Sequence, residues 1–500
     1  MAMETLDPQI CYRALRTRDA RFDGRIFVGV TSTGIYCRPV CPAGTAKFAN
    51  CRFFSSAAAA QEAGFRPCLR CRPETAPDFG AWRGTSNTVS RGLALIAEGA
   101  LDGDDANVDN LAARLGIGER QLRRLFDQHL GASPVTVAQT RRVLLAKQLI
   151  HDTRLPMGEI ALAAGFGSVR RFNETFQRLF KRPPSALRRK TVMSLREGSA
   201  AAAGVTVRLR YRPPYDWPSM LAFLRARAIA GVEWIEGERY YRTFAQDGEL
   251  GTVEISHLPE RESLSVTIRA ADLKALPAVI ARVRRVFDLG ADVAEIGTHL
   301  AQDPLLAPLI AERPGLRAPG GWDGFELAMR AILGQQVTVE AARQLAGHLV
   351  RLCGTVLPAA QRMPAALSHA FPAAAQVKAA NLARLGMPAA RKTALTSLAD
   401  AALANPDLFQ PLASVEETVA RLRAIRGIGE WTAHYIALRA VRETDAFPAS
   451  DIGLLRGAAR NGTRPSPAEL QDRAEPWRPW RAYAAQHLWA ADAARTASHS

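Results

Sequence analysis

The sequence is poor in cysteine and in acidic side chains, and it has no long apolar run. No stretch approaches the roughly 20 apolar residues that a membrane-spanning helix requires, which argues against a membrane protein. The first eight residues have no basic region and lead into no apolar segment, so we expect no secretory signal. Seven cysteines in 500 residues are too few for a disulfide framework, and we expect a cytoplasmic protein.

The excess of positive charge is large and uneven. The 65 Lys and Arg residues outnumber 48 Asp and Glu, which gives a net charge of +17 and a pI near 10.1. This excess predicts a polyanionic partner, and nucleic acid fits better than a membrane surface. Residues 107–190 alone contain 16 basic and 6 acidic residues. A solvated charged face is the usual explanation of a basic run, but this concentration favours a phosphate-binding module.

Four of the cysteines form a metal-ligand pattern. Cys37 and Cys41 are spaced C-x3-C, and the C-x2-C pair Cys68 and Cys71 begins 27 residues later. Four thiolates brought to one point suit one tetrahedral Zn²⁺. Because zinc keeps cysteines ionised, such a site is either a structural cross-link or a nucleophile toward a methyl electrophile. The spacing alone leaves both functions open.

Composition divides the chain into three segments. The cysteine-containing segment covers residues 1–80, a helical segment covers 86–190, and a linker rich in Ala and Gly covers 191–204. A sheet-containing part is expected at 205–320, and helical periodicity dominates 321–495. The strand-like stretches are residues 205–211, 252–255 and 264–268. We therefore expect a multidomain α+β protein with a small zinc domain, an all-α domain and a third domain that joins an antiparallel sheet to helices.

The all-α segment contains two similar helix-turn-helix patterns, with Gly116 and Gly165 at the turns. Each pattern ends in a helix with an apolar back and a basic, amide-bearing front, and Ser168 is the expected N-cap of the second. The residues expected to pack inward are Leu122, Leu125, Phe126, His129, Phe172, Phe176 and Leu179. The residues expected to contact DNA are Arg124, Gln128, Arg170, Arg171 and Asn173. An ordinary amphipathic helix pair is the alternative, which the two basic copies disfavour.

A second DNA-binding pattern lies near the C-terminus. Gly427 and Gly429 separate two helical stretches, which predicts a helix-hairpin-helix whose N–H groups approach a phosphate. Asp451, fourteen residues beyond Ala437, precedes another helical stretch. It is either an N-cap or a carboxylate that stabilises an oxocarbenium ion during N-glycosidic cleavage, and the two roles are compatible.

Aromatic residues concentrate in the same region. Trp431, Tyr435 and Trp489 could wall a pocket for a flipped alkylated purine, which is cationic and would gain from cation–π contacts. The alternative is core packing, which we favour for Trp477 and Trp480.

The cysteine segment, from about Asp19 to Pro73, resembles the N-terminal domain of Ada-type DNA repair regulators. The motifs that carry this resemblance are residues 27–42 and 63–73. The resemblance implies that Cys37 takes a methyl group irreversibly from a methylated DNA phosphate, while Cys41, Cys68 and Cys71 remain as ligands. Methylation would change the site from −2 to −1, and we expect this change to tighten promoter binding. The arginines expected to hold phosphate are Arg38, Arg66, Arg70 and Arg72. No Pro-Cys-His-Arg motif for a second methyl acceptor is present, and Cys353 is expected to be buried or inert.

Residues 180–188 resemble the end of AraC-type regulatory domains, which implies promoter DNA and RNA polymerase as partners. Residues 205–489 resemble the AlkA-type DNA-3-methyladenine glycosylase II family. The motifs that carry this resemblance are residues 213–217, 313–317, 330–337, 385–388, 422–437 and 477–480.

The glycosylase resemblance implies that Asp451 is the catalytic carboxylate and that Trp431, Tyr435 and Trp489 line the base pocket. It also implies that Gln336 wedges into the gap left by the flipped nucleotide. The backbone carbonyls implied to hold a monovalent cation at the hairpin are those of Arg423, Ile425 and Gly427. No Lys follows Lys392, which excludes a Schiff-base route to strand cleavage, and the four C-terminal cysteines of iron–sulfur relatives are absent.

The sequence thus predicts a monomeric repair protein that binds double-stranded DNA, both alkylated and promoter DNA. It would join a zinc methyl acceptor, an AraC-type domain and a hydrolytic glycosylase. The alternative is a transcription regulator with structural zinc and a third domain that binds DNA without catalysis.

Overall fold

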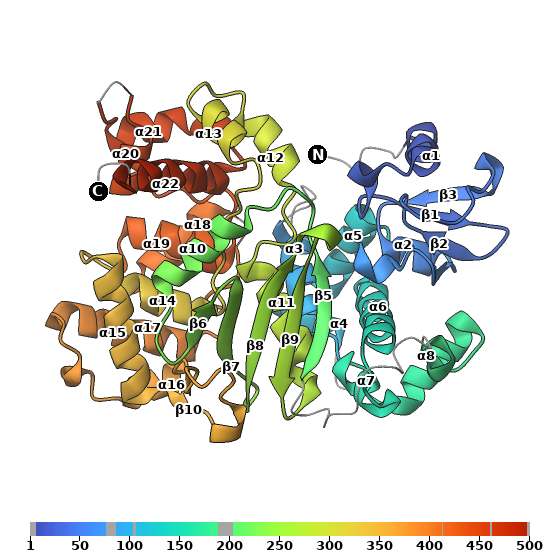
Figure 1. The fold of residues 1–500 in the computed structure, drawn as a ribbon, viewed down its shortest axis with the longest axis horizontal. Coiled ribbons are helices and arrows are strands. Elements are labelled where there is room, and N and C mark those ends of the chain that lie inside the picture. Colours follow the sequence, from blue (N-terminus) through green and yellow to red (C-terminus); the bar gives the residue numbers. More distant parts are fainter. Residues whose placement is uncertain are drawn as a thin grey trace. The chain divides into compact units, whose positions relative to one another are not determined.

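The computed structural model describes residues 7–76, 87–103, 107–188, 204–412, 414–460 and 463–497 (Figure 1). It divides into two compact units, Met1–Tyr211 with Leu258–Ala281 and Arg212–His257 with Arg282–Ser500. Apart from Gly204, the linker expected at 191–204 lies outside the described residues. No helix within the described ranges is both long and apolar enough to cross a bilayer.

The first unit begins with a small four-stranded sheet in the order β3-β1-β2-β4. Its strands are β1 (Phe27–Val30), β2 (Ile35–Cys37), β3 (Cys51–Phe54) and β4 (Arg66–Pro67), flanked by α1 (Pro8–Thr17) and α2 (Ala57–Glu62). Phe27, Tyr36, Ala60 and Phe65 form a compact core. Strands β2 and β4 run parallel with Tyr36 opposite Pro67, so the chain leaves both strands at the same end. This register places Cys37 beside Cys68.

The middle of the first unit is helical, as the sequence predicts. Its helices are α3 (Asn87–Ala97), α4 (Val108–Arg114), α5 (Glu119–Leu130), α6 (Pro134–Asp152), α7 (Met157–Ala163) and α8 (Val169–Phe180). Gly116 and Gly165 have φ of 72° and 86° at the two turns. The side chain of Ser168 caps α8 by accepting from the Arg171 N–H at 3.2 Å. Leu122, Phe126, Phe172 and Phe176 are fully buried, while Leu125, His129 and Leu179 are half-buried.

All three expected strands form, and two further strands accompany them. In the first unit β5 (Val205–Arg210) pairs with β9 (Ser263–Ala270), and in the second β6 (Glu233–Glu236), β7 (Arg239–Gln246) and β8 (Glu249–Leu258) pair in antiparallel succession. Strands β6 and β7 were not expected from the sequence. Five successive residues of β7 are buried, so it shows no alternation of apolar and polar residues.

The rest of the second unit is mainly helical. Its helices are α10 (Trp217–Arg227), α12 (Val293–Leu300), α13 (Leu306–Glu312), α14 (Gly324–Leu333), α15 (Val339–Cys353), α16 (Ala374–Ala379), α17 (Ala389–Ala404), α18 (Val415–Arg423), α19 (Glu430–Ile436), α20 (Ile452–Gly457), α21 (Pro467–Arg473) and α22 (Arg481–Ala497). A further helix, α11 (Leu276–Val286), precedes α12. Helix α19 continues into a π-helical turn, Ala437–Val441.

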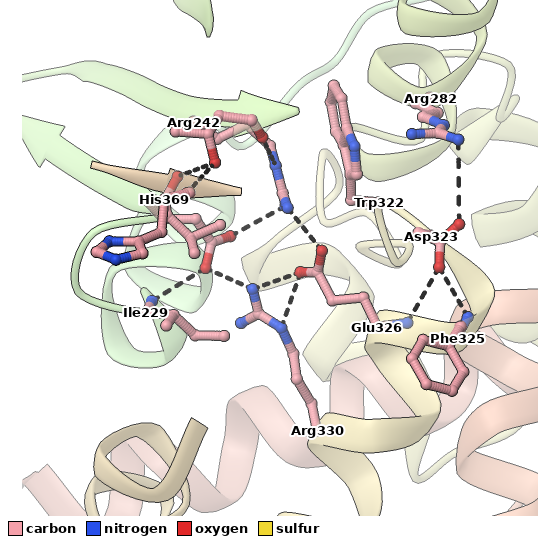
Figure 2. A network of polar contacts seen from close by, with 12 residues as sticks. Ile229, Arg242, Arg282, Trp322, Asp323, Phe325, Glu326, Arg330 and His369 are labelled. Carbon is pink, nitrogen blue, oxygen red and sulfur yellow. Dashed lines mark hydrogen bonds and ion pairs between the residues drawn. The ribbon is translucent and has the colours of Figure 1, made fainter. Parts of the chain in front are cut away.

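A buried ionic network joins the strands of the second unit to α14 (Figure 2). Arg330 of α14 bonds Glu233 and Glu326 at 2.6 Å, and Arg242 of β7 bonds Glu326 at 2.7 Å. Burial alone would lower the pKa of Arg330, but the two carboxylates outweigh it and raise that pKa. Because breaking one member would leave an uncompensated buried charge, the network fixes α14 and the turn that follows it.

Candidate functional site

The four predicted cysteine ligands meet at one point. The sulfur atoms of Cys37, Cys41, Cys68 and Cys71 all lie within 4.8 Å of one another. Tetrahedral zinc with Zn–S bonds of about 2.3 Å requires sulfur separations of about 3.8 Å, so this donor set fits one Zn²⁺. The backbone N–H groups of Arg38 and Arg70 point at the sulfurs of Cys71 and Cys68, at 3.4 and 3.3 Å. Such donors stabilise thiolate ligands.

The four ligands differ in accessibility. Cys41, Cys68 and Cys71 are buried, whereas Cys37 at the end of β2 is partly exposed. Cys37 is therefore the ligand residue that solvent reaches most. Cys353, outside this cluster, is half-buried, and burial raises the pKa of its thiol to about 11, as expected for an inert thiol.

Two of the four arginines expected to hold phosphate are committed elsewhere. Arg38 is buried and forms an ion pair with Asp23, and its guanidinium also bonds Thr75 Oγ1 at 2.7 Å. Arg72 pairs with Glu74 at 2.9 Å and with Asp152 at 3.0 Å. The expectation for these two was wrong, because their spacing from the cysteines reveals nothing of their carboxylate partners. Arg70 is exposed and Arg66 is partly exposed.

Helix α6 holds the zinc loop directly. Lys147 of α6 is fully buried and donates from Nζ to the backbone carbonyl of Cys68 at 2.8 Å and to Glu74 at 2.5 Å. Burial would raise the pKa of Glu74, but His151, Lys147 and Arg72 together lower it to about 2. The carboxylate therefore stays ionised and ties a ligand-bearing loop to the helix between the two helix-turn-helix units.

The expected DNA-contacting side chains of the first unit lie on exposed helix faces. Arg124 and Gln128 project from α5, and Arg170, Arg171 and Asn173 from the first turns of α8. Arg170 also forms an exposed ion pair with Glu174 at 2.8 Å, which would cost little to break.

The hairpin forms between α18 and α19. Gly427 adopts φ of +90°, and a Cβ there would lie 2.3 Å from the Ala394 Cβ of α17. Gly429 is the N-cap of α19, with open space around it. Glycine at position 427 is thus required both by backbone conformation and by close packing.

The turn after α14 is tied to this hairpin by Gln335, which the sequence analysis did not single out. Its Nε2 lies 3.0 Å from the Gly427 carbonyl and 3.1 Å from Thr432 Oγ1. The next residue, Gln336, is exposed and has φ of +58°, a strained conformation for a residue with a side chain.

Asp451 lies at the centre of the aromatic cluster. Its carboxylate accepts from Trp431 Nε1 at 2.7 Å and from Trp489 Nε1 at 2.9 Å, and it caps α20 by accepting from the Leu454 N–H at 3.0 Å. The Trp431 and Tyr435 rings stack with centroids 5.4 Å apart, and Trp489 meets Tyr435 edge-on at 6.4 Å. The structure thus brings together the four residues that the sequence analysis named. Trp477 is buried and packs on Phe447, as expected of a core residue.

Close packing holds α20 beside α22. A Cβ on Gly457 would lie 2.2 Å from the Leu488 carbonyl oxygen, so only glycine permits this approach. The carboxylate at the N-terminus of α20 is thereby placed next to Trp489 of α22.

A buried cation, Arg439, lies against the same rings and was also missed. It comes from the π-helical turn after α19, and its Cζ is 5.0 Å from the Trp489 centroid and 5.8 Å from that of Tyr435. Arg439 follows Tyr435 by four residues, a spacing that places both on one face of a helix. Because arginine is usually exposed, the sequence gave no indication that this side chain is buried.

Three family models match the chain, one for each predicted module. They are described as the metal binding domain of Ada at residues 10–74, a helix-turn-helix domain at 111–190 and the AlkA N-terminal domain at 206–323.

Two curated relatives cover long parts of the chain. It is 39% identical over 484 residues to the "probable bifunctional transcriptional activator/DNA repair enzyme AlkA" of Mycobacterium tuberculosis, an alignment that covers 97% of this chain and 96% of the relative. It is 36% identical over 290 residues to DNA-3-methyladenine glycosylase 2 of Escherichia coli, covering 56% of this chain and 95% of that protein.

A solved structure shares the fold of the larger part. The 3-methyladenine DNA-glycosylase from Archaeoglobus fulgidus matches with a TM-score of 0.50 at 20% identity, covering 57% of this chain and 98% of that one.

Proposed function

Because this chain belongs to the family of bifunctional transcriptional activators and DNA repair enzymes of the AlkA type, we propose that it excises alkylated bases from DNA by hydrolysis and also regulates transcription. The observation that carries the excision half is the Asp451 carboxylate, held by the N–H groups of two tryptophans that wall an aromatic cluster. 3-Methyladenine and similar bases are the proposed substrates.

In the proposed reaction the damaged nucleotide leaves the stack, and its base enters the aromatic cluster. The N-glycosidic bond breaks, its electron pair leaves with the base, and positive charge develops on the sugar. The Asp451 carboxylate stabilises that charge and accepts a proton from the water that adds to C1′. Three N–H donors orient the carboxylate without neutralising it.

The hairpin and the turn after α14 would grip the strand. Gly427 and Gly429 let the backbone approach a phosphate, and a monovalent cation would bind at the carbonyls of Arg423, Ile425 and Gly427. The Gly427 carbonyl would share this role with its hydrogen bond from Gln335. Gln336, exposed and strained beside this contact, is the proposed wedge.

Base release from methylated DNA tests the excision half. Asp451→Asn should abolish release while leaving DNA binding and folding intact. Asp492→Asn is the matched control: Asp492 also lies near Gly453, but its carboxylate pairs with Arg456. If the parent and Asp451→Asn both leave methylated bases attached, the alternative of a non-catalytic DNA-binding domain is correct.

For the first unit we propose methyl transfer from a DNA methylphosphotriester to Cys37. When bound, zinc keeps the four sulfurs as thiolates. The Cys37 sulfur forms a bond to the methyl carbon, the O–CH₃ bond breaks, and its electron pair returns to the phosphate as a diester anion. The partial exposure of Cys37 among three buried ligands supports this assignment.

Intact mass tests the methyl transfer. Incubation with DNA that carries a methylphosphotriester should add the mass of one methyl group to the parent chain. The addition should be absent in Cys37→Ala and present in Cys51→Ala, since Cys51 lies outside the ligand set. Transfer to another cysteine would overturn the assignment.

Regulation follows from the loss of one negative charge at the ligand cluster. Reduced repulsion from DNA phosphates should tighten promoter binding through the exposed faces of α5 and α8, with RNA polymerase as the proposed partner of the bound activator. Equal operator affinities before and after methylation would contradict this proposal.

A further inference from the structure

The proposed base pocket is backed by a buried guanidinium. Arg439 is 2% exposed, and its Cζ lies 5.0 Å from the Trp489 centroid, 5.8 Å from that of Tyr435 and 4.8 Å from that of Phe223. Two of these three rings belong to the proposed pocket. A cation close to an aromatic ring polarises its π electrons toward itself, which weakens the attraction of the ring for a second cation.

The charge of Arg439 is not neutralised by a carboxylate. Its guanidinium donates to the Pro319 carbonyl at 2.9 Å and to Gln486 Oε1 at 2.8 Å, and it also interacts with the Tyr435 hydroxyl. None of these three partners is a carboxylate. No ion pair joins Arg439 to an acidic side chain in the described part of the chain. Burial lowers the pKa of Arg439 to about 10, so the group stays charged at neutral pH.

The Asp451 carboxylate meets these rings at their edges. It accepts from the indole N–H groups of Trp431 and Trp489, whereas Arg439 is placed over the ring of Trp489. The carboxylate thus lies at the ring edges, positioned for the sugar, whereas the charge that lies over a ring face is positive.

We propose that Arg439 is a specificity-determining residue that lowers the preference of this pocket for cationic over neutral damaged bases. The proposal rests on the assignment of Trp431, Tyr435 and Trp489 as the base pocket. Cation–π attraction alone would make the pocket select alkylated purines that carry a positive charge. Arg439 opposes that attraction, so a neutral damaged base such as hypoxanthine also competes for the site.

The sharpest test adds a negative charge beside the guanidinium without changing shape. Gln486→Glu would convert the 2.8 Å hydrogen bond into an ion pair on α22. Single-turnover release would be measured on duplexes with one 7-methylguanine, which is cationic, or one hypoxanthine, which is neutral. The ratio of the two rates cancels losses from altered folding and from Asp451, and comparing this ratio between variant and parent also cancels the intrinsic lability of each base.

We expect Gln486→Glu to raise the ratio of cationic to neutral base release by about threefold to tenfold. Gln486→Met, which removes the hydrogen bond but adds no charge, should leave the ratio unchanged. An unchanged ratio in Gln486→Glu, or no release of the neutral base by the parent chain, would overturn the proposal.

Substitution of Arg439 itself gives a second test. Arg439→Lys keeps the charge and should retain the parent ratio, whereas Arg439→Gln should raise it, even if both variants are less stable. A parent-like ratio in the Gln variant would contradict the role of Arg439. Failure of the proposed function itself is recognised separately, because the parent chain would then release neither base.

Discussion

At the scale of single residues, the Asp451 carboxylate is held in place by three hydrogen bonds. Its three donors come from three elements: Trp431 of α19, Leu454 of α20 and Trp489 of α22. Each indole also forms part of the aromatic cluster, so the same two side chains position the proposed catalytic group and wall the proposed pocket. The two functions can be separated by removing the indole nitrogen and keeping an aromatic ring.

We predict that Trp489→Phe lowers kcat for base release by about tenfold or more, because it removes a hydrogen bond to a charged group. KM should change little, since a ring remains to stack on the base. Trp480→Phe, outside this cluster, serves as the control in the same steady-state assay. An unchanged kcat in Trp489→Phe would show that the indole N–H does not position Asp451.

The role of a residue could be predicted from the sequence when its partners belong to the same motif. The four cysteines, Asp451 and the three pocket aromatics were found from spacing and family resemblance, and the structure brings each group together. Arg38 was misjudged because its partner, Asp23, lies 15 residues away in sequence and forms no recognisable pattern with it. The importance of Arg439 and Lys147 likewise depends on burial against distant segments, which an isolated sequence does not reveal.

At the scale of elements, the hairpin depends on the packing of α17 behind it. Gly427 sits against Ala394, and the turn after α14 reaches the Gly427 carbonyl through Gln335. The buried ionic network of Figure 2 fixes α14 and hence the start of that turn. Helix α17, helix α14 and the turn after α14 therefore determine where the hairpin backbone lies.

We predict different costs for alanine at the two hairpin glycines. Gly427→Ala places a Cβ in a left-handed conformation and against Ala394, and should lower the free energy of unfolding by about 2 kcal/mol or more. Gly429→Ala enters open space at an ordinary φ of −83° and should cost less than about 1 kcal/mol. Urea unfolding followed by tryptophan fluorescence measures both. Equal costs would contradict the packing at Gly427.

Elements were predictable where their periodicity was regular. Helices α5 and α8 follow the 3.6-residue repeat of their buried residues, and β5 and β9 alternate. Strand β7 was missed because consecutive buried residues, among them Tyr240 and Phe244, look no different from a short buried helix. Only its pairing with β6 and β8 identifies it.

At the scale of the whole molecule, buried ions join the zinc loop to the regulatory helices within the first unit. Lys147 and Arg72 supply two positive charges, and Glu74 and Asp152 supply two negative ones. The ammonium of Lys147 contacts the carbonyl of a zinc ligand, Cys68. Under the proposed function, a change of charge at the ligands would therefore occur close to α6.

We predict that Lys147→Met uncouples the two functions of the first unit. Methyl transfer to Cys37 should persist, but the gain in operator affinity on methylation should fall, because the helix no longer senses the ligand charge. Gel-shift titrations before and after methylation measure the gain, with Arg154→Met, outside this cluster, as the control. A full methylation-dependent gain in Lys147→Met would refute the coupling.

We also predict that the second unit loses stability in mild acid. Burial lowers the pKa of His487 to about 4, so below about pH 6.5 the unfolded chain binds a proton that the native chain refuses. The free energy of unfolding should decrease as pH falls from 6.5 to 4, by on the order of 3 kcal/mol from this residue. Urea titrations of the parent and His487→Gln at several pH values measure this slope.

The slope should be reduced in His487→Gln and kept in His348→Gln, because His348 is exposed. Seven of the eight tryptophans belong to the second unit, so their fluorescence reports on it selectively. A slope that is the same in His487→Gln and the parent would assign the acid sensitivity to other groups.

Cys37 is partly exposed and would react once, whereas Asp451 would act through water and react repeatedly. This difference affects how a population of these molecules responds to continuing damage. Under the proposed function, a molecule spends its sulfur acceptor once, whereas its carboxylate is restored after every turnover. The fraction of chains methylated at Cys37 would then increase with the number of phosphotriesters repaired, and every chain would keep its excision activity. This methylated fraction would fall only through cell growth and synthesis of new chains, because the methyl transfer itself is irreversible.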